Sequence, residues 1–267
     1  MAIGIALSWS AKQYVVFEDE RTRPVRDLLG ALPPIDARSV IDLGCGPGNS
    51  TEVLSARYPH AQTAGIDSSA DMIAAARRRL PSVRFAVQDL QTWKDGDRSE
   101  GGGPFDVILA NAVLQWVPDH AALLPKLAAR LAPNGALAVQ MPDNLGEPAH
   151  ELMREVAVGG PWAAKLAASS AARPPLAGAA WYYELLRPLC RVDLWRTTYY
   201  HFLSGGAPAV VEWFKGSGLR PFLEPLDDAE RSAFLERYTA AIARAYPPAE
   251  DGGVLLPFPR MFLTAIR

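Results

Sequence analysis

The chain of 267 residues contains little cysteine and little net charge, and each scarcity excludes a class of protein. Cys45 and Cys190 are its only cysteines and lie far apart, which argues against a disulfide framework or a metal site and favours a reducing, cytoplasmic location. A formal net charge of −2 argues against a nucleic-acid partner held by bulk electrostatics. The opening run MAIGIALSW is too short to span a bilayer and has no signal-peptide pattern, so we expect no membrane association.

Hydrophobic residues make up 49% of the chain, enough for one large domain or for a domain with an added lobe. Residues 38–141 alternate short apolar runs with helical patterns, which is typical of a parallel α/β sheet covered on both faces. The expected strands are 39–44, 61–67, 83–89, 105–111 and 136–141. The expected helices are 49–58, 69–80 and 120–131, the last closed by a turn at Pro133-Asn134-Gly135.

The pattern of apolar residues changes after Met141. Residues 144–190 and 208–245 have helical patterns, while 195–203 and 258–267 have the composition of strands. We therefore expect an N-terminal helical segment at 1–37 that is part of a lid, a core at 38–143, and a helical lid with the last two sheet strands at 144–267. The charged, glycine-rich stretch 94–103 is predicted to be a surface loop.

The stretch DLGCGPGN (42–49) lies at a predicted strand-to-helix turn, where glycines let the backbone turn sharply and approach a ligand. A pyrophosphate would need amide donors there, but Pro47 removes one of them and Asp42 adds a carboxylate. This chemistry suits an ammonium group, and S-adenosylmethionine has one and lacks phosphate. A plain tight turn and a nicotinamide dinucleotide site are the alternatives.

Acidic residues stand at the ends of three successive predicted strands: Asp42, Asp67 and Asp89. Packing alone does not predict this pattern, because aspartate is a poor strand residue. Asp67 follows the glycines by the distance at which a ribose-binding acid is found in such folds, and Asp89 could accept a hydrogen bond from an adenine amino group. The alternative for Asp67 is the N-cap of the following helix, a role that Ser68 or Ser69 could also fill.

Several blocks of the sequence carry a family resemblance. They are DLGCGPGNST (42–51), GIDSSADMIAAAR (65–77), ANAVLQWVPDH (110–120), AVQMPDN (138–144), EPAHELMREVA (147–157), VDLWRTTYYH (192–201), GLRPFL (218–223) and FPRMFL (258–263). Through them the chain resembles the class I S-adenosylmethionine-dependent methyltransferases, and more narrowly the trans-aconitate 2-methyltransferase family. The first block is shared by many methyltransferases, whereas QMPDN, WRTTYYH and GLRP are more particular to the narrower family.

The resemblance implies an α/β fold with a Rossmann-like sheet of seven strands, an antiparallel final hairpin and a helical lid. It also implies bound S-adenosylmethionine and esterification of one carboxylate of trans-aconitate, or a closely related polycarboxylate, to a monomethyl ester. The positions that match the family's cofactor contacts are Asp42, Gly44, Gly46, Asp67, Asp89 and Asn111. The further cofactor candidates are Asn49, Ser68, Met72, Gln88, Leu90, Gln115, Trp116 and Trp9; hydrophobic packing is the alternative for Trp116 and Trp9.

A carboxylate acceptor has a reference pKa of about 4, so it is ionised at neutral pH and needs no general base. We accordingly expect no catalytic side chain, and the rate would come from placement in a dry site. Recognition of a polycarboxylate favours arginine. The substrate-binding candidates are Arg196, Tyr199, Tyr200, His201, Arg220, Arg23 and Arg260. For Arg196, an ion pair with Asp193 or Glu212 is an equally good alternative.

Strand alternation puts Trp195, Thr197, Tyr199 and His201 on one face of their strand, and Arg196, Thr198 and Tyr200 on the other. Four other functions remain open from sequence: methylation of another small carboxylic acid, methylation of a carrier-bound malonyl thioester, binding of the cofactor without turnover, and an NAD-dependent dehydrogenase. The expected partner is a small molecule, with the protein a monomer or a homodimer.

Overall fold

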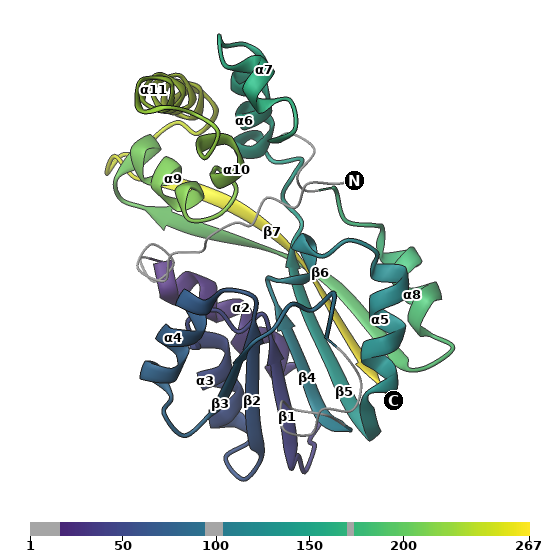
Figure 1. Ribbon diagram of the computed structural model, residues 1–267. Coiled ribbons are helices and arrows are strands. Elements are labelled where there is room, and N and C mark those ends of the chain that lie inside the picture. Colours follow the sequence, from purple (N-terminus) through teal and green to yellow (C-terminus); the bar gives the residue numbers. More distant parts are fainter. Residues whose placement is uncertain (1–16, 94–103, 170–173) are drawn as a thin grey trace. The chain divides into compact units, whose positions relative to one another are not determined.

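The computed structural model describes residues 17–93, 104–169 and 174–267 (Figure 1). Its strands form one seven-stranded sheet in the order β3-β2-β1-β4-β5-β7-β6, with an antiparallel closing hairpin. The strands are β1 (Ser39–Leu43), β2 (Gln62–Asp67), β3 (Arg84–Val87), β4 (Phe105–Asn111), β5 (Leu131–Pro142), β6 (Arg191–Leu203) and β7 (Val254–Ile266). This is the sheet that the sequence predicts.

Helices cover both faces of the parallel part of the sheet (Figure 1). One face carries α2 (Glu18–Gly30), α3 (Asn49–Arg57) and α4 (Ala70–Arg79), and the other carries α5 (His120–Ala129) and α8 (Ala179–Leu186). The short helix η3 (Leu114–Trp116) follows β4. The remaining helices are α6 (Pro148–Val158), α7 (Ala163–Leu166), α9 (Gly206–Lys215), α10 (Arg220–Leu223) and α11 (Asp228–Ala245).

Contacts divide the described chain into two compact units. The sheet unit comprises residues 17–142, Leu176–Thr197 and Met261–Arg267, and the helical unit comprises Asp143–Pro175 and Thr198–Arg260. This grouping differs from the sequence division at 38 and 144, because residues 17–37, α8 and the far ends of β6 and β7 group with the parallel strands. Among the described helices, none has the length and apolar character required to cross a membrane.

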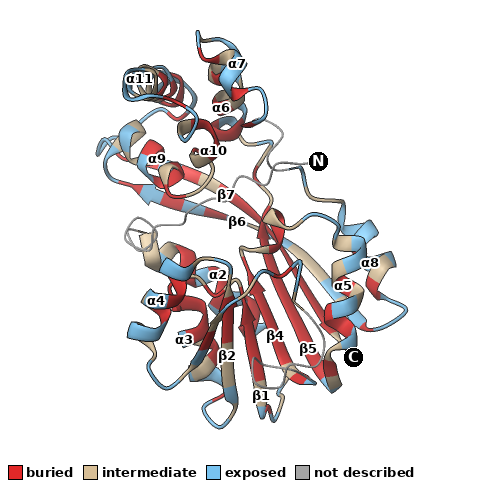
Figure 2. Ribbon diagram, viewed as in Figure 1, coloured by how far each residue is buried: buried red, intermediate tan, exposed pale blue. Residues whose placement is uncertain are grey.

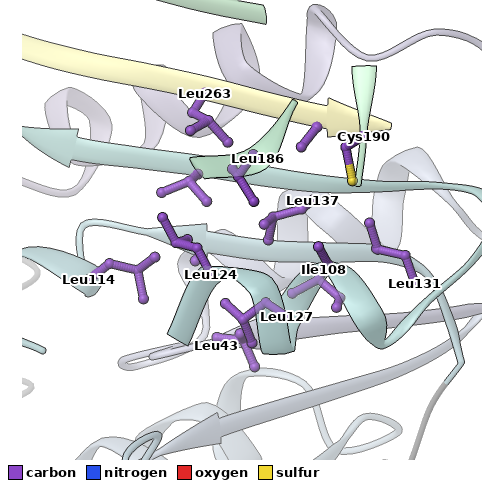
Figure 3. Close-up of a cluster of buried hydrophobic side chains, with 14 of the residues drawn as sticks. Leu43, Ile108, Leu114, Leu124, Leu127, Leu131, Leu137, Leu186, Cys190 and Leu263 are labelled. Atoms are coloured by element: carbon purple, nitrogen blue, oxygen red, sulfur yellow. The ribbon is translucent and has the colours of Figure 1, made fainter. Parts of the chain in front are cut away.

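The central parallel strands β1, β4 and β5 form because their apolar runs are largely buried on both faces (Figure 2), whereas β2 and β3, at one side of the sheet, are more exposed. Against one face, α5 and α8 contribute Leu124, Leu127 and Leu186 to a cluster with Ile108 and Leu137 (Figure 3). Burying each such side chain contributes about 1.5–3 kcal/mol. The cluster thereby fixes the strands whose carboxyl ends carry the candidate site.

The turn expected at Pro133-Asn134-Gly135 lies inside β5 instead of ahead of it. The helix α5 ends at Ala129, and Leu131 already pairs with Phe105 before the register shifts and Ala136 pairs with Val107. Asn134 has a φ of 63°, and its backbone N–H donates to the carbonyl of Arg267. The residues that predicted a turn therefore form a bulge within a longer strand, and hydrogen bonds to the backbone near Phe105 and at Arg267 hold this bulge in place.

Side chains alternate between the two faces along the whole of β6, but the face that is buried differs between the start and the end of the strand. Near its start Val192 and Leu194 pack against the core of the sheet unit, while Arg191 and Asp193 are exposed. Near its end Tyr199, His201 and Leu203 are buried in the helical unit, while Tyr200 and Phe202 are exposed. Each half of the strand therefore buries a different set of alternate residues.

Candidate active site

The order of the strands reverses between β1 and β4, and this is where the candidate cofactor site lies. The two strands pair in parallel, with Asp42 opposite Leu109 and Leu43 opposite Ala110. The loops that leave their carboxyl ends run to helices on opposite faces of the sheet, α3 and α5 (Figure 1). Ligands of open α/β sheets bind at such a switch point, outside the carboxyl ends of the strands.

The backbone conformation of the loop between β1 and α3 favours glycine at three positions. Gly44, Gly46 and Gly48 have φ values of 66°, 53° and 96°, in the left-handed region that side chains disfavour. A Cβ atom on Gly44 would lie 2.3 Å from Cγ2 of Val113, so the loop also runs in contact with the segment after β4. The loop thus brings bare backbone to the carboxyl edge of the sheet.

Asp42 lies beneath this loop and is completely buried. Its Oδ2 accepts hydrogen bonds from the hydroxyls of Ser50 and Thr51, both at 2.7 Å, which tie the strand to the first turn of α3. Burial raises the pKa of Asp42 to about 7, against the two hydroxyl bonds that lower it, while the nearby Asp67 raises it further. The site can therefore hold this group as a carboxyl or a carboxylate near neutral pH.

Asp67 ends β2 and fixes two backbone segments at once. Its Oδ2 accepts from the N–H of Gly46 at 3.0 Å, and its Oδ1 accepts from the N–H of Ser69 at 2.8 Å. Burial raises the pKa of Asp67, and these two hydrogen bonds lower it. The hydroxyl of Ser69 accepts from the N–H of Met72 and so caps α4, which leaves Asp67 to join the glycine loop to the start of that helix.

The segment after β4 is the second wall of the site. Asn111 is buried at the end of the strand, and Ala112 follows with a φ of 53°, its N–H donating to the carbonyl of Gln140 at 2.8 Å. Gln115 is also buried, and its Nε2 donates back to the carbonyl of Ala112 at 2.7 Å. The Gln115 side-chain amide is therefore held within a short, closed loop that begins directly after Asn111.

Three buried side-chain oxygens in this region have no hydrogen-bond partner among the described residues: Oδ1 of Asp42, Oδ1 of Asn111 and Oε1 of Gln115. Leaving a buried acceptor unsatisfied costs about 1–3 kcal/mol. All three belong to β1, to the end of β4 or to the turn that follows β4. The site thus offers hydrogen-bond acceptors and suits a ligand that brings donors or positive charge.

The structure distributes the other cofactor candidates over different environments. Asn49 is buried and donates from Nδ2 to Oγ1 of Thr22 on α2, at 3.1 Å. Met72 and Leu90 are buried, Gln88 and Trp116 are partly exposed, and Ser68 and Asp89 are exposed. Asp89 lies beyond the end of β3, where its Oδ1 accepts from the N–H of Gln91 at 2.9 Å. Trp9 lies outside the described residues, and the cofactor role of every candidate stays a prediction.

A second cluster of site candidates lies within the helical unit. Tyr199 and His201 of β6 are buried on the face that they share with Phe258 and Arg260 of β7, the neighbouring strand. The Arg260 guanidinium carbon lies 4.6 Å from the ring centre of Phe258 and 5.8 Å from that of Tyr199. Trp213 of α9 stacks on His201 at 4.6 Å between ring centres. The result is a buried cation among aromatic rings.

The remaining substrate candidates have other local surroundings. Arg196 and Tyr200 are exposed and belong to the opposite set of alternate residues on β6, as the sequence predicts. Arg220 begins α10, where its Nη2 donates to Oε1 of Glu224 at 3.0 Å. Arg23 is an exposed residue of α2, with its Nε 3.9 Å from Oδ2 of Asp27. Their contact with substrate stays a prediction.

Sequence reasoning missed the residues that support the candidates. The hydroxyls of Ser50 and Thr51 orient Asp42. The sequence could have indicated them, because two adjacent hydroxyl residues at the start of the helix that follows the glycine loop lie close to the end of the preceding strand. Trp213 and Phe258 carried no comparable signal, because a tertiary contact brings α9 and β7 together. The described residues contain no group of three or more His, Cys, Asp or Glu side chains that could hold a metal ion.

Comparisons with known proteins identify the family to which the chain belongs. A family model described as a methyltransferase domain matches residues 17–192. The chain is 55% identical over 260 residues to the trans-aconitate 2-methyltransferase of Methylobacterium nodulans, covering 97% of this chain and 98% of that one. It is 52% identical to the enzyme of the same name from Azoarcus sp., covering 97% of this chain and 99% of that one.

Solved structures with this fold are more distant in sequence. The YcgJ protein of Bacillus subtilis aligns with a TM-score of 0.59 at 12% identity, covering 92% of this chain and 98% of that one. The phosphoethanolamine N-methyltransferase 2 of Haemonchus contortus, solved with S-adenosylhomocysteine, aligns with a TM-score of 0.54 at 16% identity, covering 92% of this chain and 52% of that one. The fold, the domain match and the full-length identities together place this chain in the trans-aconitate 2-methyltransferase family of S-adenosylmethionine-dependent methyltransferases.

Proposed function

We propose that this protein transfers the methyl group of S-adenosylmethionine to one carboxylate of trans-aconitate and releases the monomethyl ester. The relatives above carry that activity in their names, and they match this chain over nearly its full length. A cytoplasmic location and a monomeric or homodimeric state are the accompanying predictions from the sequence.

The observation that carries the cofactor proposal is the set of buried oxygens of Asp42, Asn111 and Gln115 that lack partners among the described residues. S-adenosylmethionine brings an ammonium group, a sulfonium charge, ribose hydroxyls and an adenine amino group, all of which attract or donate to such oxygens. A dinucleotide would bring a pyrophosphate, which would be repelled by the Asp42 carboxylate. The residues present therefore fit the sulfonium cofactor better than the dinucleotide.

We assign a different task to each part of this site. Asp42, Asn111 and Gln115 would receive the amino-acid end of the cofactor, and Asp67 at the end of β2 would accept hydrogen bonds from the ribose. Gly44 and Gly46 let the ligand lie close to the backbone, because both have positive φ values that disfavour a side chain, and at Gly44 the contact with Val113 also leaves no room for one.

For the acid, we propose Arg260 as the principal cation, with Tyr199 and His201 beside it as hydrogen-bonding groups. Arg260 is buried, so an anion that reaches it interacts in a medium of low dielectric constant and is held more strongly than at an exposed arginine. The rings of Phe258 and Trp213 exclude water from the same cluster. Arg196, Tyr200, Arg220 and Arg23 stay predicted contacts.

The chemistry asks the protein for placement. S-adenosylmethionine supplies an electrophilic methyl group, and its transfer to a carboxylate oxygen forms the ester C–O bond, breaks the C–S bond and leaves S-adenosylhomocysteine. The acceptor carboxylate is already ionised at neutral pH, so the chain need not remove a proton. Its residues bind, orient and desolvate the reacting groups, which can supply several kcal/mol of rate acceleration.

Product analysis tests this proposal. Purified protein is incubated with methyl-labelled S-adenosylmethionine and with trans-aconitate, cis-aconitate, citrate and a malonyl thioester in parallel. We expect labelled monomethyl ester chiefly from trans-aconitate, with one equivalent of S-adenosylhomocysteine per ester. Turnover of another acid but not of trans-aconitate would refute the substrate assignment, and cofactor binding without any ester would refute the enzyme assignment.

A further inference from the structure

The loop from β4 to α5 is held in a conformation that its sequence disfavours. It begins at Ala112, with a φ of 53°, and ends at Asp119, with a φ of 60°. Neither residue is glycine, and the left-handed region is unfavourable for a residue with a side chain. Such a loop keeps its shape only where surrounding contacts determine it, so the contacts that hold it bear on the position of Asn111 and Gln115.

His120 makes the contact that spans this loop. Its Nε2 lies 2.8 Å from the carbonyl oxygen of Leu114, and its Nδ1 lies 2.8 Å from the hydroxyl oxygen of Tyr182 on α8. A carbonyl can only accept, so Nε2 carries the proton. In the neutral ring Nδ1 then accepts from the Tyr182 hydroxyl. One imidazole thus joins η3, α5 and α8.

The bond from His120 acts on the turn that carries Gln115. The carbonyl of Leu114 also accepts from the N–H of Val117 at 2.9 Å, which is one of the hydrogen bonds that form the turn of η3. The imidazole therefore fixes the carbonyl on which this turn depends. Gln115 is the next residue, and its Nε2 donates to the carbonyl of Ala112 at 2.7 Å. A shift of the Leu114 carbonyl would therefore move the Gln115 amide.

Tyr182 supports this assignment by its surroundings. Its side chain is fully buried within the apolar cluster formed by α5, α8 and the sheet, where phenylalanine would fill nearly the same space. A hydroxyl inside such a cluster requires a polar partner, and the ring of His120 provides one. The neighbouring Tyr183 is exposed, so the same helix offers a matched comparison.

We propose that His120 and Tyr182 are positioning residues for the cofactor. The Tyr182 hydroxyl donates to Nδ1 of His120, Nε2 of His120 donates to the carbonyl of Leu114, and these two hydrogen bonds fix the loop that carries Gln115. The inference rests on the proposed function, because the cofactor that the loop would hold is S-adenosylmethionine. Neither residue contacts the reacting groups in this scheme.

The test compares Tyr182→Phe with Tyr183→Phe, since both remove one phenolic hydroxyl from the same helix. Calorimetric titration of each protein with S-adenosylhomocysteine, well below its unfolding temperature, measures cofactor affinity without turnover. The unfolding temperature without ligand and the KM for trans-aconitate are measured on the same samples. Two further variants change the imidazole: His120→Gln keeps a donor and an acceptor, and His120→Ala keeps neither.

Loss of the Tyr182 hydroxyl should leave the binding-competent loop only partly populated. If its population falls to about one fifth, the dissociation constant for S-adenosylhomocysteine rises about fivefold, while the KM for trans-aconitate stays unchanged. Tyr183→Phe should match the wild type. His120→Ala should weaken binding at least as much as Tyr182→Phe, and His120→Gln should recover most of the affinity.

A purely structural role gives a different result. Tyr182→Phe would then lower the unfolding temperature but bind S-adenosylhomocysteine as Tyr183→Phe does, and that outcome overturns the inference. Equal losses in His120→Gln and His120→Ala would also overturn it, because the donor and acceptor would not be what matters. If the wild type itself fails to bind S-adenosylhomocysteine, the proposed function fails first and the inference falls with it.

Discussion

Asp42 allows the electrostatics of the cofactor site to be tested through protein stability. Its carboxyl is completely buried, and burial raises its pKa from 3.8 to about 7. Because the folded protein favours the protonated acid, the stabilisation is fully present below pH 3.8 and is lost as the pH rises to about 7. Replacement by asparagine keeps an oxygen for Ser50 and Thr51 and removes the titration.

The magnitude follows from these two pKa values. Their difference of about three, at about 1.4 kcal/mol for each tenfold change in ionisation, amounts to about 4 kcal/mol. Relative to Asp42→Asn, the wild type should therefore lose up to about 4 kcal/mol of unfolding free energy between pH 4 and pH 7, and lose no more above pH 8.

Urea unfolding of the two proteins across pH 4 to 8.5, without ligand, measures this difference. Titrating groups that do not interact with Asp42 contribute equally in both proteins and cancel, whereas Asp67, whose charge interacts with Asp42, contributes to the measured difference. The cofactor adds a second readout, because an ammonium group beside Asp42 favours the carboxylate. Affinity for S-adenosylhomocysteine should accordingly rise with pH through about 7 in the wild type and much less in Asp42→Asn. A difference in stability that stays constant with pH would refute the reasoning.

Three further predictions concern single residues of the two clusters. Gly44→Ala should weaken binding of S-adenosylhomocysteine at least tenfold, because the alanine would have a φ of 66° and its Cβ would lie 2.3 Å from Val113. Adding Val113→Ala should restore part of the affinity. No recovery in the double variant would contradict the steric explanation. Asp67→Ala removes the acceptor for the N–H groups of Gly46 and Ser69 as well as the proposed ribose contact. It should weaken cofactor binding, measured by calorimetry, by about 1–3 kcal/mol. Unchanged affinity would mean that the pocket lies elsewhere. Arg260→Met should raise the KM for trans-aconitate without changing cofactor affinity. The same measurement on Arg196→Met shows which face of β6 the acid contacts. A larger effect at Arg196 would place the substrate on the exposed face of the strand.

The fold could be predicted because its signals are local. The apolar runs at 39–43 and 105–111 are buried on both faces, and such runs separated by helical patterns favour a parallel sheet. The boundaries of β5 and β6 were predicted less well. Leu131 pairs with Phe105 across a bulge, and a pairing of this kind depends on a partner strand far away in sequence.

The candidate site divides in the same way. Glycines and acids at strand ends are recognisable because the backbone demands them, and Asp42, Gly44 and Asp67 all lie at the carboxyl edge of the sheet. The burial of Arg260 and the exposure of Arg196 could not be read from composition. Both are arginines of late strands, and tertiary packing, which composition does not reveal, buries Arg260 and leaves Arg196 exposed. The link from His120 to Tyr182 is equally hidden, because 62 residues separate them.

The central claim is that the glycine loop and its buried oxygens form a site for a sulfonium cofactor. Calorimetric titration of the wild-type protein with S-adenosylhomocysteine and, separately, with NAD tests it most directly. We expect saturable binding of S-adenosylhomocysteine with one site per chain and no measurable binding of NAD. Binding of NAD in preference to S-adenosylhomocysteine would contradict the account.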